Sequence, residues 1–192
     1  MEPTSEQIAG LNIALNEARL LQYDFDHDQR RAIVQLGVVV LLEGAAIHSE
    51  KRIELRLVPI GRVAATLIWD GVHRQLELSD IAGAVKSFGA LPIYGWEFID
   101  PPSDNLADWS ELLSLDFRNG TSGMKHALHL FQENERGKLD LCLWFDELDV
   151  GGQLTLDELI VDGKRWWDAV SAGDPRAAAA GFHPSSGGDS DQ

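Results

Sequence analysis

The stretch that decides the fold is residues 52–58, RIELRLV, in which charged and apolar side chains alternate from Arg52 to Leu57. The isoleucine and the two leucines project to one side of an extended chain, and the two arginines and the glutamate project to the other. This two-residue period is typical of a β-strand that has one face against a core and the other toward solvent. The segments on either side should therefore supply its partner strands.

Both flanking segments contain strand patterns separated by turn residues. On the N-terminal side, residues 21–25 alternate, residues 26–29 (DHDQ) read as a turn, and residues 31–42 are dominated by β-branched and aliphatic side chains. This combination predicts a hairpin. On the C-terminal side, two strand-like runs flank Asp70-Gly71, a dipeptide that strongly favours a tight hairpin turn.

The remaining segments extend the same pattern, with a few helices between the strands. Thr4 and Gln7 are spaced as a helix-capping box. Ser79 and Gly89 are placed to begin and end a short helix, and a second short helix should carry Trp166 and Trp167. The predicted strands, in chain order, are residues 21–25, 31–42, 52–58, 63–69, 72–78, 93–99, 112–118, 124–132, 139–145 and 154–161.

These elements predict a mainly β (α+β) fold with about nine or ten strands and two or three short helices. The strands should form either an antiparallel β-sandwich or a strongly curled sheet packed by the helices. Residues 1–16 are predicted as an N-terminal arm or short helix, residues 17–173 as a single β-rich domain, and residues 174–192 as a flexible C-terminal tail.

Composition and charge remove several classes of function. The chain of 192 residues carries 16 basic and 31 acidic side chains, a net charge of −15, of which −12 falls in residues 97–192. Such acidity argues against a nucleic-acid partner. The most apolar run, residues 33–42, includes Gln35 and is half of what a membrane helix needs, and no targeting signal is evident. We therefore expect a cytoplasmic protein with no membrane partner.

The sequence also lacks the motifs of common enzymes and metal sites. Cys142 is the only cysteine, which excludes an internal disulfide and a multi-cysteine zinc site. Its apolar neighbours indicate a small core residue rather than a reactive thiol. Neither a phosphate-binding glycine loop nor a serine nucleophile elbow is present. We therefore predict no cofactor, no metal and no catalytic residue.

Two histidines leave a hydrolase as one alternative. His126 and His129 are three residues apart, so on the predicted strand they lie on opposite faces. His129 alternates with Ala127 and Phe131 and is expected to be the more buried of the two. A hydrolase would require one of these histidines to converge with Asp116 or another carboxylate in a single cleft.

Six tryptophans point to binding rather than catalysis. They are suited either to a sugar-binding platform of coplanar exposed rings or to anchors in a protein interface. Trp166 and Trp167 are adjacent, so on a helix their side chains differ in direction by about 100°. One of them should cover the sheet while the other flanks it.

Several phrases of the sequence together resemble a known group of proteins. They are LNEARLLQYDFDHDQRRAIVQLGVVVLL, RIELRLVPIGRV, IYGWEFIDPP, SLDFRNG and LDLCLWFDELDV. Over residues 17–168 the chain resembles small acidic bacterial proteins, some of which are similar to the immunity proteins of polymorphic toxin systems. The resemblance implies a protein that binds and neutralises a toxin domain. It brings no catalytic residues with it.

The favoured hypothesis is thus a non-enzymatic acidic protein that binds a basic protein partner and is immunity-like. The alternatives are a carbohydrate-binding β-module and the hydrolase described above. An exposed edge strand would allow either a monomer or a homodimer. The residues predicted to contact the partner are Asp146, Glu147, Asp149, Trp166 and Trp167.

Overall fold

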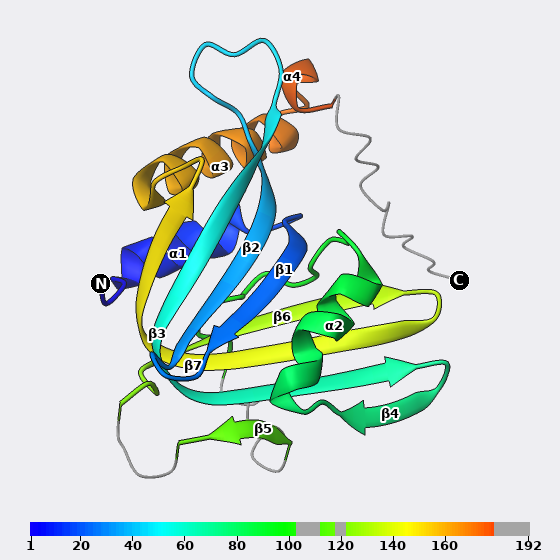
Figure 1. Ribbon diagram of the computed structural model, residues 1–192. Coiled ribbons are helices and arrows are strands. Elements are labelled where there is room, and N and C mark those ends of the chain that lie inside the picture. Colours follow the sequence, from blue (N-terminus) through cyan, green and yellow to red (C-terminus); the bar gives the residue numbers. More distant parts are fainter. Residues whose placement is uncertain (103–111, 118–121, 179–192) are drawn as a thin grey trace.

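The computed structural model describes residues 1–102, 112–117 and 122–178, and within them the chain forms one antiparallel sheet and four helices (Figure 1). In chain order the elements are α1 (Ser5–Ala14), β1 (Arg19–Asp26), β2 (Arg31–Val40), β3 (Ser49–Trp69), β4 (Val72–Gln75), α2 (Leu78–Phe88), β5 (Leu113–Asp116), β6 (His126–Asn134), β7 (Gly137–Gly152), α3 (Leu156–Ser171) and α4 (Pro175–Ala178).

The long strand β3 organises the sheet. Its N-terminal half pairs with β2, its C-terminal half pairs with β4 and β5, and β7 follows it on the other side along both halves. The order β1-β2-β3-β7-β6 completes the sheet. The β3–β7 register shifts between Ile60 and Arg62, and such a bulge bends a strand and increases its twist. Figure 1 shows the sheet turning there from an upright half to a half that runs across the view.

The mainly β class predicted from the sequence is confirmed. Of the two predicted arrangements, the structure shows the single curled sheet, because β3 and β7 run through both halves and join them. The alternation in residues 52–58 is also confirmed, since Ile53, Leu55 and Leu57 are buried. Residues 52–58 and 63–69, expected as separate strands, are both parts of β3.

One predicted strand is a helix. Residues 154–161 were expected to be extended, but α3 begins at Leu156 and continues to Ser171. Its buried side includes Leu156, Leu159 and Trp166 at helical spacing. Thr155 and Glu158 form a capping box at its start, which fixes the helical conformation.

Another predicted strand is an irregular loop. Residues 93–99 contact their neighbours through main-chain hydrogen bonds, with an isolated bridge between Ile99 and Leu128. Gly95 adopts a φ of 144°, outside the range of a regular strand, so it interrupts the extended run. The expectation for Ser79 is also wrong: Glu77 is the N-cap residue of α2 and makes no side-chain capping bond.

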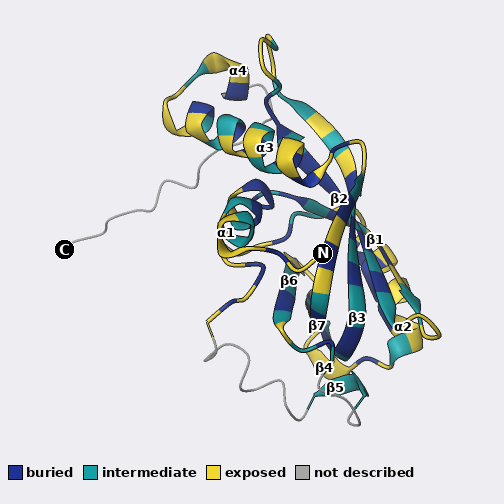
Figure 2. Ribbon diagram, turned by 90° about the vertical axis from the view of Figure 1, so that its left-hand side faces the viewer, coloured by how far each residue is buried: buried dark blue, intermediate teal, exposed yellow. Residues whose placement is uncertain are grey.

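The helices pack on the sheet at two places. Helices α1 and α3 lie side by side on the same side of the sheet (Figures 1 and 2), while α2 packs against β1 and β3. Contact between α1 and α3 is close because Gly10 faces Ile160 and Gly163 faces Ala14. One continuous cluster of buried apolar side chains joins α1, α2, α3 and the strands.

The N-terminus and residues 174–178 both contact this body. The predicted capping box of Thr4 and Gln7 is present at α1. The short helix α4 lies in the segment predicted as a tail, and Ala177 is buried there with Leu41 and Trp166. Residues 174–178 therefore do not form a flexible tail, and residues 179–192 lie outside the described part of the chain.

Candidate functional site

Asp146, the first of the predicted partner-binding acids, is engaged within the chain. Its Oδ1 accepts hydrogen bonds from the backbone N–H groups of Met124 at 2.9 Å and Lys125 at 3.2 Å. Burial acts to raise the pKa of Asp146, but hydrogen bonds from the backbone, including that of Gly123, outweigh it and hold the pKa below its usual value. Asp146 therefore stabilises the start of β6 rather than presenting a free charge.

The other two predicted acids are also paired. Glu147 lies 3.5 Å from the N-terminal ammonium of Met1, and Asp149 lies 3.3 Å from Arg56. Both carboxylates are more than half exposed, so they contribute to the long-range negative field of the molecule. Exposed ion pairs of this kind add little to stability.

The two predicted tryptophans have different environments. Trp166 is only 1% exposed and packs with Leu41 and Ala169. Its prediction as a partner contact is corrected, because a side chain buried under α3 does not reach a partner. Trp167 is half-buried beside this cluster. This division, with one ring inside and one flanking, matches the expectation from their helical spacing.

A third tryptophan extends this pair to the surface. The ring centroids of Trp166 and Trp167 are 4.8 Å apart, and those of Trp167 and Trp96 are 6.0 Å apart. Trp96 is 72% exposed. The rings are inclined by 69°, which is edge-to-face, and by 53°, which is tilted, so these three tryptophans do not form a flat platform.

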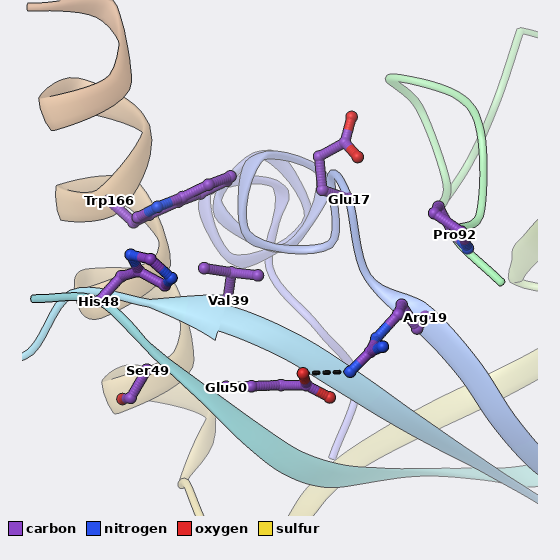
Figure 3. A pocket seen from close by; sticks show the side chains of 8 residues that line it. All are labelled: Glu17, Arg19, Val39, His48, Ser49, Glu50, Pro92 and Trp166. Carbon is purple, nitrogen blue, oxygen red and sulfur yellow. Dashed lines mark hydrogen bonds and ion pairs between the residues drawn. The ribbon is translucent and has the colours of Figure 1, made fainter. Parts of the chain in front are cut away.

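A cavity of about 350 Å³ lies at the buried end of this series. Figure 3 shows Trp166 reaching from α3 over Val39 and His48, with the ion pair of Arg19 and Glu50 on the opposite side. The opposite charges of Arg19 and Glu50 are paired with each other. The cavity is lined by Glu17, Arg19, Val39, His48, Ser49, Glu50, Pro92 and Trp166.

The two histidines of β6 are each bonded to a different carboxylate. His126 Nδ1 lies 2.8 Å from Asp100 Oδ2, and His129 Nε2 lies 3.0 Å from Asp140 Oδ1. Their opposite orientation on the strand agrees with the sequence prediction. The expected order of burial is wrong, since the His126 side chain is 12% exposed and that of His129 is 24% exposed.

The hydrolase stays a prediction, because His129 meets a carboxylate, that of Asp140, in one depression of the surface. Asp116 pairs with Arg62 at 3.3 Å, while the histidines bond other carboxylates on opposite sheet faces. Cys142 is fully buried with Ala64 and Ala127. Burial and then the charge of Asp140 raise the pKa of its thiol, which keeps it protonated and unreactive. Across residues 1–102, 112–117 and 122–178, no three potential metal ligands are grouped to hold an ion.

Among the residues that the structure describes, Tyr94 and Trp96 are the large exposed aromatic side chains, and they belong to a segment we call the aromatic loop, residues 92–100. It runs beside β6: the N–H of Tyr94 donates to the carbonyl of Phe131 at 2.8 Å, and the N–H of His129 donates to the carbonyl of Phe98 at 2.7 Å. Tyr94 and Trp96 are exposed by 52% and 72%, while Phe98 is buried.

Asn12 of α1 fixes the far end of the aromatic loop. Its Oδ1 accepts hydrogen bonds from the N–H groups of Phe98 at 3.0 Å and Ile99 at 2.8 Å, and its Nδ2 donates to the carbonyl of Ile99 at 3.1 Å. Sequence reasoning missed this role, because an asparagine at that position only weakens a predicted helix.

Beneath the exposed rings lies a second cavity of about 330 Å³, which we call the aromatic pocket. The rings of Tyr94 and Phe131 are 6.3 Å apart and inclined by 59°. Carboxylates and aromatic faces therefore meet in one open depression. The lining residues are Tyr94, Gly95, Trp96, Glu97, Phe98, Pro101, His129, Phe131 and Asp140.

Comparisons of the chain with protein-family models, with curated proteins and with solved structures gave no match. Among the described residues, no helix has the length and apolar character required to cross a bilayer.

Proposed function

We propose that this protein binds a basic protein partner in the cytoplasm and neutralises it, in the manner that the resemblance to toxin-immunity proteins implies. The observation that carries this proposal is the exposure of Tyr94 and Trp96, close together on one anchored loop. Large exposed aromatic side chains are the usual anchors of protein interfaces. The neighbouring carboxylate of Glu97 adds charge that suits a basic partner.

The contact surface we propose differs from the one expected from the sequence. Asp146, Glu147 and Asp149 already have partners in the chain, so they are not the centre of the interface. Their charges still belong to a molecule with a net charge of −15. Such a field accelerates the approach of a basic protein, while aromatic contacts determine how slowly the complex dissociates.

The aromatic rings favour a protein partner over a sugar. A carbohydrate platform needs exposed rings in one plane, whereas the exposed ring of Trp96 is inclined by 53° to that of Trp167. Trp109 lies outside the described residues and does not enter this comparison.

The test is to isolate the partner from the host and to measure its affinity for surface variants. The tagged protein is used to capture the partner at about 50 mM salt, and elution at about 500 mM salt tests the electrostatic contribution. With the identified partner purified, Trp96→Ala should weaken binding by about 30-fold or more, as expected for an interface anchor. Val72→Ala removes another exposed apolar side chain, on β4, and serves as the control.

Neutralisation is tested in the same cells. Expression of the identified partner should harm the cells, and co-expression of this protein should protect them. The Trp96→Ala variant should protect them less. Equal binding by Trp96→Ala and Val72→Ala, or capture that yields only acidic proteins, would contradict the proposal.

A further inference from the structure

We infer that the aromatic pocket binds an arginine side chain of the partner. This inference rests on the proposed function and specifies which chemical group the site recognises. The pocket brings together the rings of Tyr94, Trp96 and Phe131 with the carboxylate of Asp140. An aromatic face and a carboxylate are the two groups that a guanidinium contacts most favourably.

The angles between the rings suit a cation that is enclosed rather than a flat ligand. Tyr94 and Phe131 are inclined by 59° with their centroids 6.3 Å apart, so they form two walls instead of one platform. Aromatic faces attract cations within about 6 Å of the ring centroid. Phe131 already has such a neighbour, because Lys138 Nζ lies 6.0 Å from its centroid. That ammonium is paired with Glu133 at 3.0 Å.

The charge of the lining selects a cation over an anion. Asp140 and Glu97 are the carboxylic acids of the lining, and its other ionisable side chains are His129 and the phenol of Tyr94. The hydrogen bond from His129 Nε2 fixes Oδ1 of Asp140 at 3.0 Å. Oδ2 has no hydrogen-bond partner within the part of the chain that the structure describes. A charged N–H donor satisfies this oxygen, whereas an anion is repelled by both carboxylates.

Arginine fits this arrangement better than lysine. A guanidinium is planar, stacks on an aromatic ring and presents several N–H donors in fixed directions. Trp96 offers a large exposed face at the mouth of the pocket, and Asp140 lies within the same lining. A lysine ammonium is a compact, strongly hydrated charge and loses more hydration on entry.

The first experiment uses small probes and the full-length protein. Titration with N-acetyl-arginine amide is followed through the indole resonance of Trp96 and the backbone resonances of the aromatic loop by two-dimensional NMR. N-acetyl-citrulline amide has the same shape without the charge, and N-acetyl-lysine amide has the charge without the planar fork. We expect millimolar affinity for the arginine probe and at least tenfold weaker binding of the other two.

Variants connect the binding to the pocket. Asp140→Asn and Trp96→Ala should each weaken binding of the arginine probe by tenfold or more. Asp28→Asn makes the same change of charge in the exposed β1–β2 turn and should leave the affinity unchanged. Because Asp140→Asn also alters the contact with His129, its unfolding curve is measured in parallel. Trp96→Ala alters a largely exposed side chain and is the second, independent variant.

The outcomes separate this inference from the proposed function. Equal binding of the arginine and citrulline probes, or unperturbed resonances of Tyr94 and Trp96, overturns the cation pocket even if a protein partner is captured. Lysine binding as tight as that of arginine overturns the assignment to a guanidinium. Selective arginine binding by a protein that captures no partner supports the pocket and refutes the proposed function.

Discussion

The close packing of α1 and α3 predicts that one glycine-to-alanine substitution stabilises the protein while another does not. A Cβ at Gly163 would lie 2.7 Å from Cβ and 3.0 Å from Cα of Ala14. A Cβ at Gly83 in α2 would have no heavy atom within 4 Å. Both glycines lie inside helices, so the gain in helical propensity is the same at both positions.

The two substitutions differ only in the space that the new methyl group meets. Alanine is favoured over glycine inside a helix by about 1 kcal/mol. At position 83 this gain is unopposed, so Gly83→Ala should stabilise the protein by up to about 1 kcal/mol. At position 163 the methyl group meets the backbone of α1, and overpacking costs about 1–3 kcal/mol. Gly163→Ala should therefore lie between neutral and about 2 kcal/mol destabilising.

Urea unfolding followed by far-ultraviolet circular dichroism measures both variants against the parent protein. The double variant Ala14→Gly/Gly163→Ala removes the nearest opposing atom. The double variant should be more stable than the sum of the two single effects predicts. A double-mutant cycle measures this difference in unfolding free energy. If Gly163→Ala and Gly83→Ala stabilise the protein equally, the close approach of α1 and α3 is refuted.

Three further predictions concern single side chains. Tyr23 is 3% exposed and its hydroxyl has no hydrogen-bond partner among the described residues, so Tyr23→Phe should stabilise the protein by about 1 kcal/mol in urea unfolding. Burial, and then the charge of Asp24, raise the pKa of Tyr23; the parent should therefore lose stability above about pH 10, where the unfolded phenol ionises first, and Tyr23→Phe should lose less. Asp146→Asn should destabilise by about 1 kcal/mol at pH 7. Because the folded pKa of Asp146 is lowered, this difference should shrink as the pH falls below about 4. Glu17 has a φ of 62°, so Glu17→Gly should raise the unfolding free energy by about 1 kcal/mol; burial raises the pKa of Glu17, so the gain should be larger at pH 7 than near pH 4. Equal stability of variant and parent across these pH ranges would contradict each assignment.

Strands and turns could be predicted from the sequence where they depend on residues adjacent in the chain. The alternation in residues 52–58 and the turn at Asp70-Gly71 are both present, because each is set by side-chain direction and local backbone preference. The length of β3 could not be read in the same way. The predicted strand ended at Val58, whereas β3 continues through Pro59 to Trp69, past the shift in the β3–β7 register between Ile60 and Arg62.

The strand prediction for residues 154–161 was wrong because strand and helix signals compete in this short segment. Residues 154–161 are rich in Leu, Ile and Val, and this composition favours a strand. The capping box of Thr155 and Glu158 and the spacing of the buried leucines are helical signals in the same segment. The neighbouring surface of α1, remote in sequence, allows the helix to bury its apolar side.

The aromatic pocket could not be predicted as a site. A regular strand would place Tyr94, Trp96 and Phe98 on one face, whereas Gly95 breaks the extended run and only Phe98 turns inward. The other walls come from β6 and β7, at His129, Phe131 and Asp140, far from the aromatic loop along the chain. The sequence showed that the segment was rich in aromatic residues, but not which partners it would meet.

The continuity of β3 and β7 has a consequence for how the protein opens. Both strands cross the bend, so the upright half and the transverse half of the sheet are built on the same two continuous strands. Local opening is common where elements are joined by few contacts. Here the slowest amide protons on both sides of Ile60 should exchange with solvent through one shared global event, which makes the bent sheet a single cooperative unit.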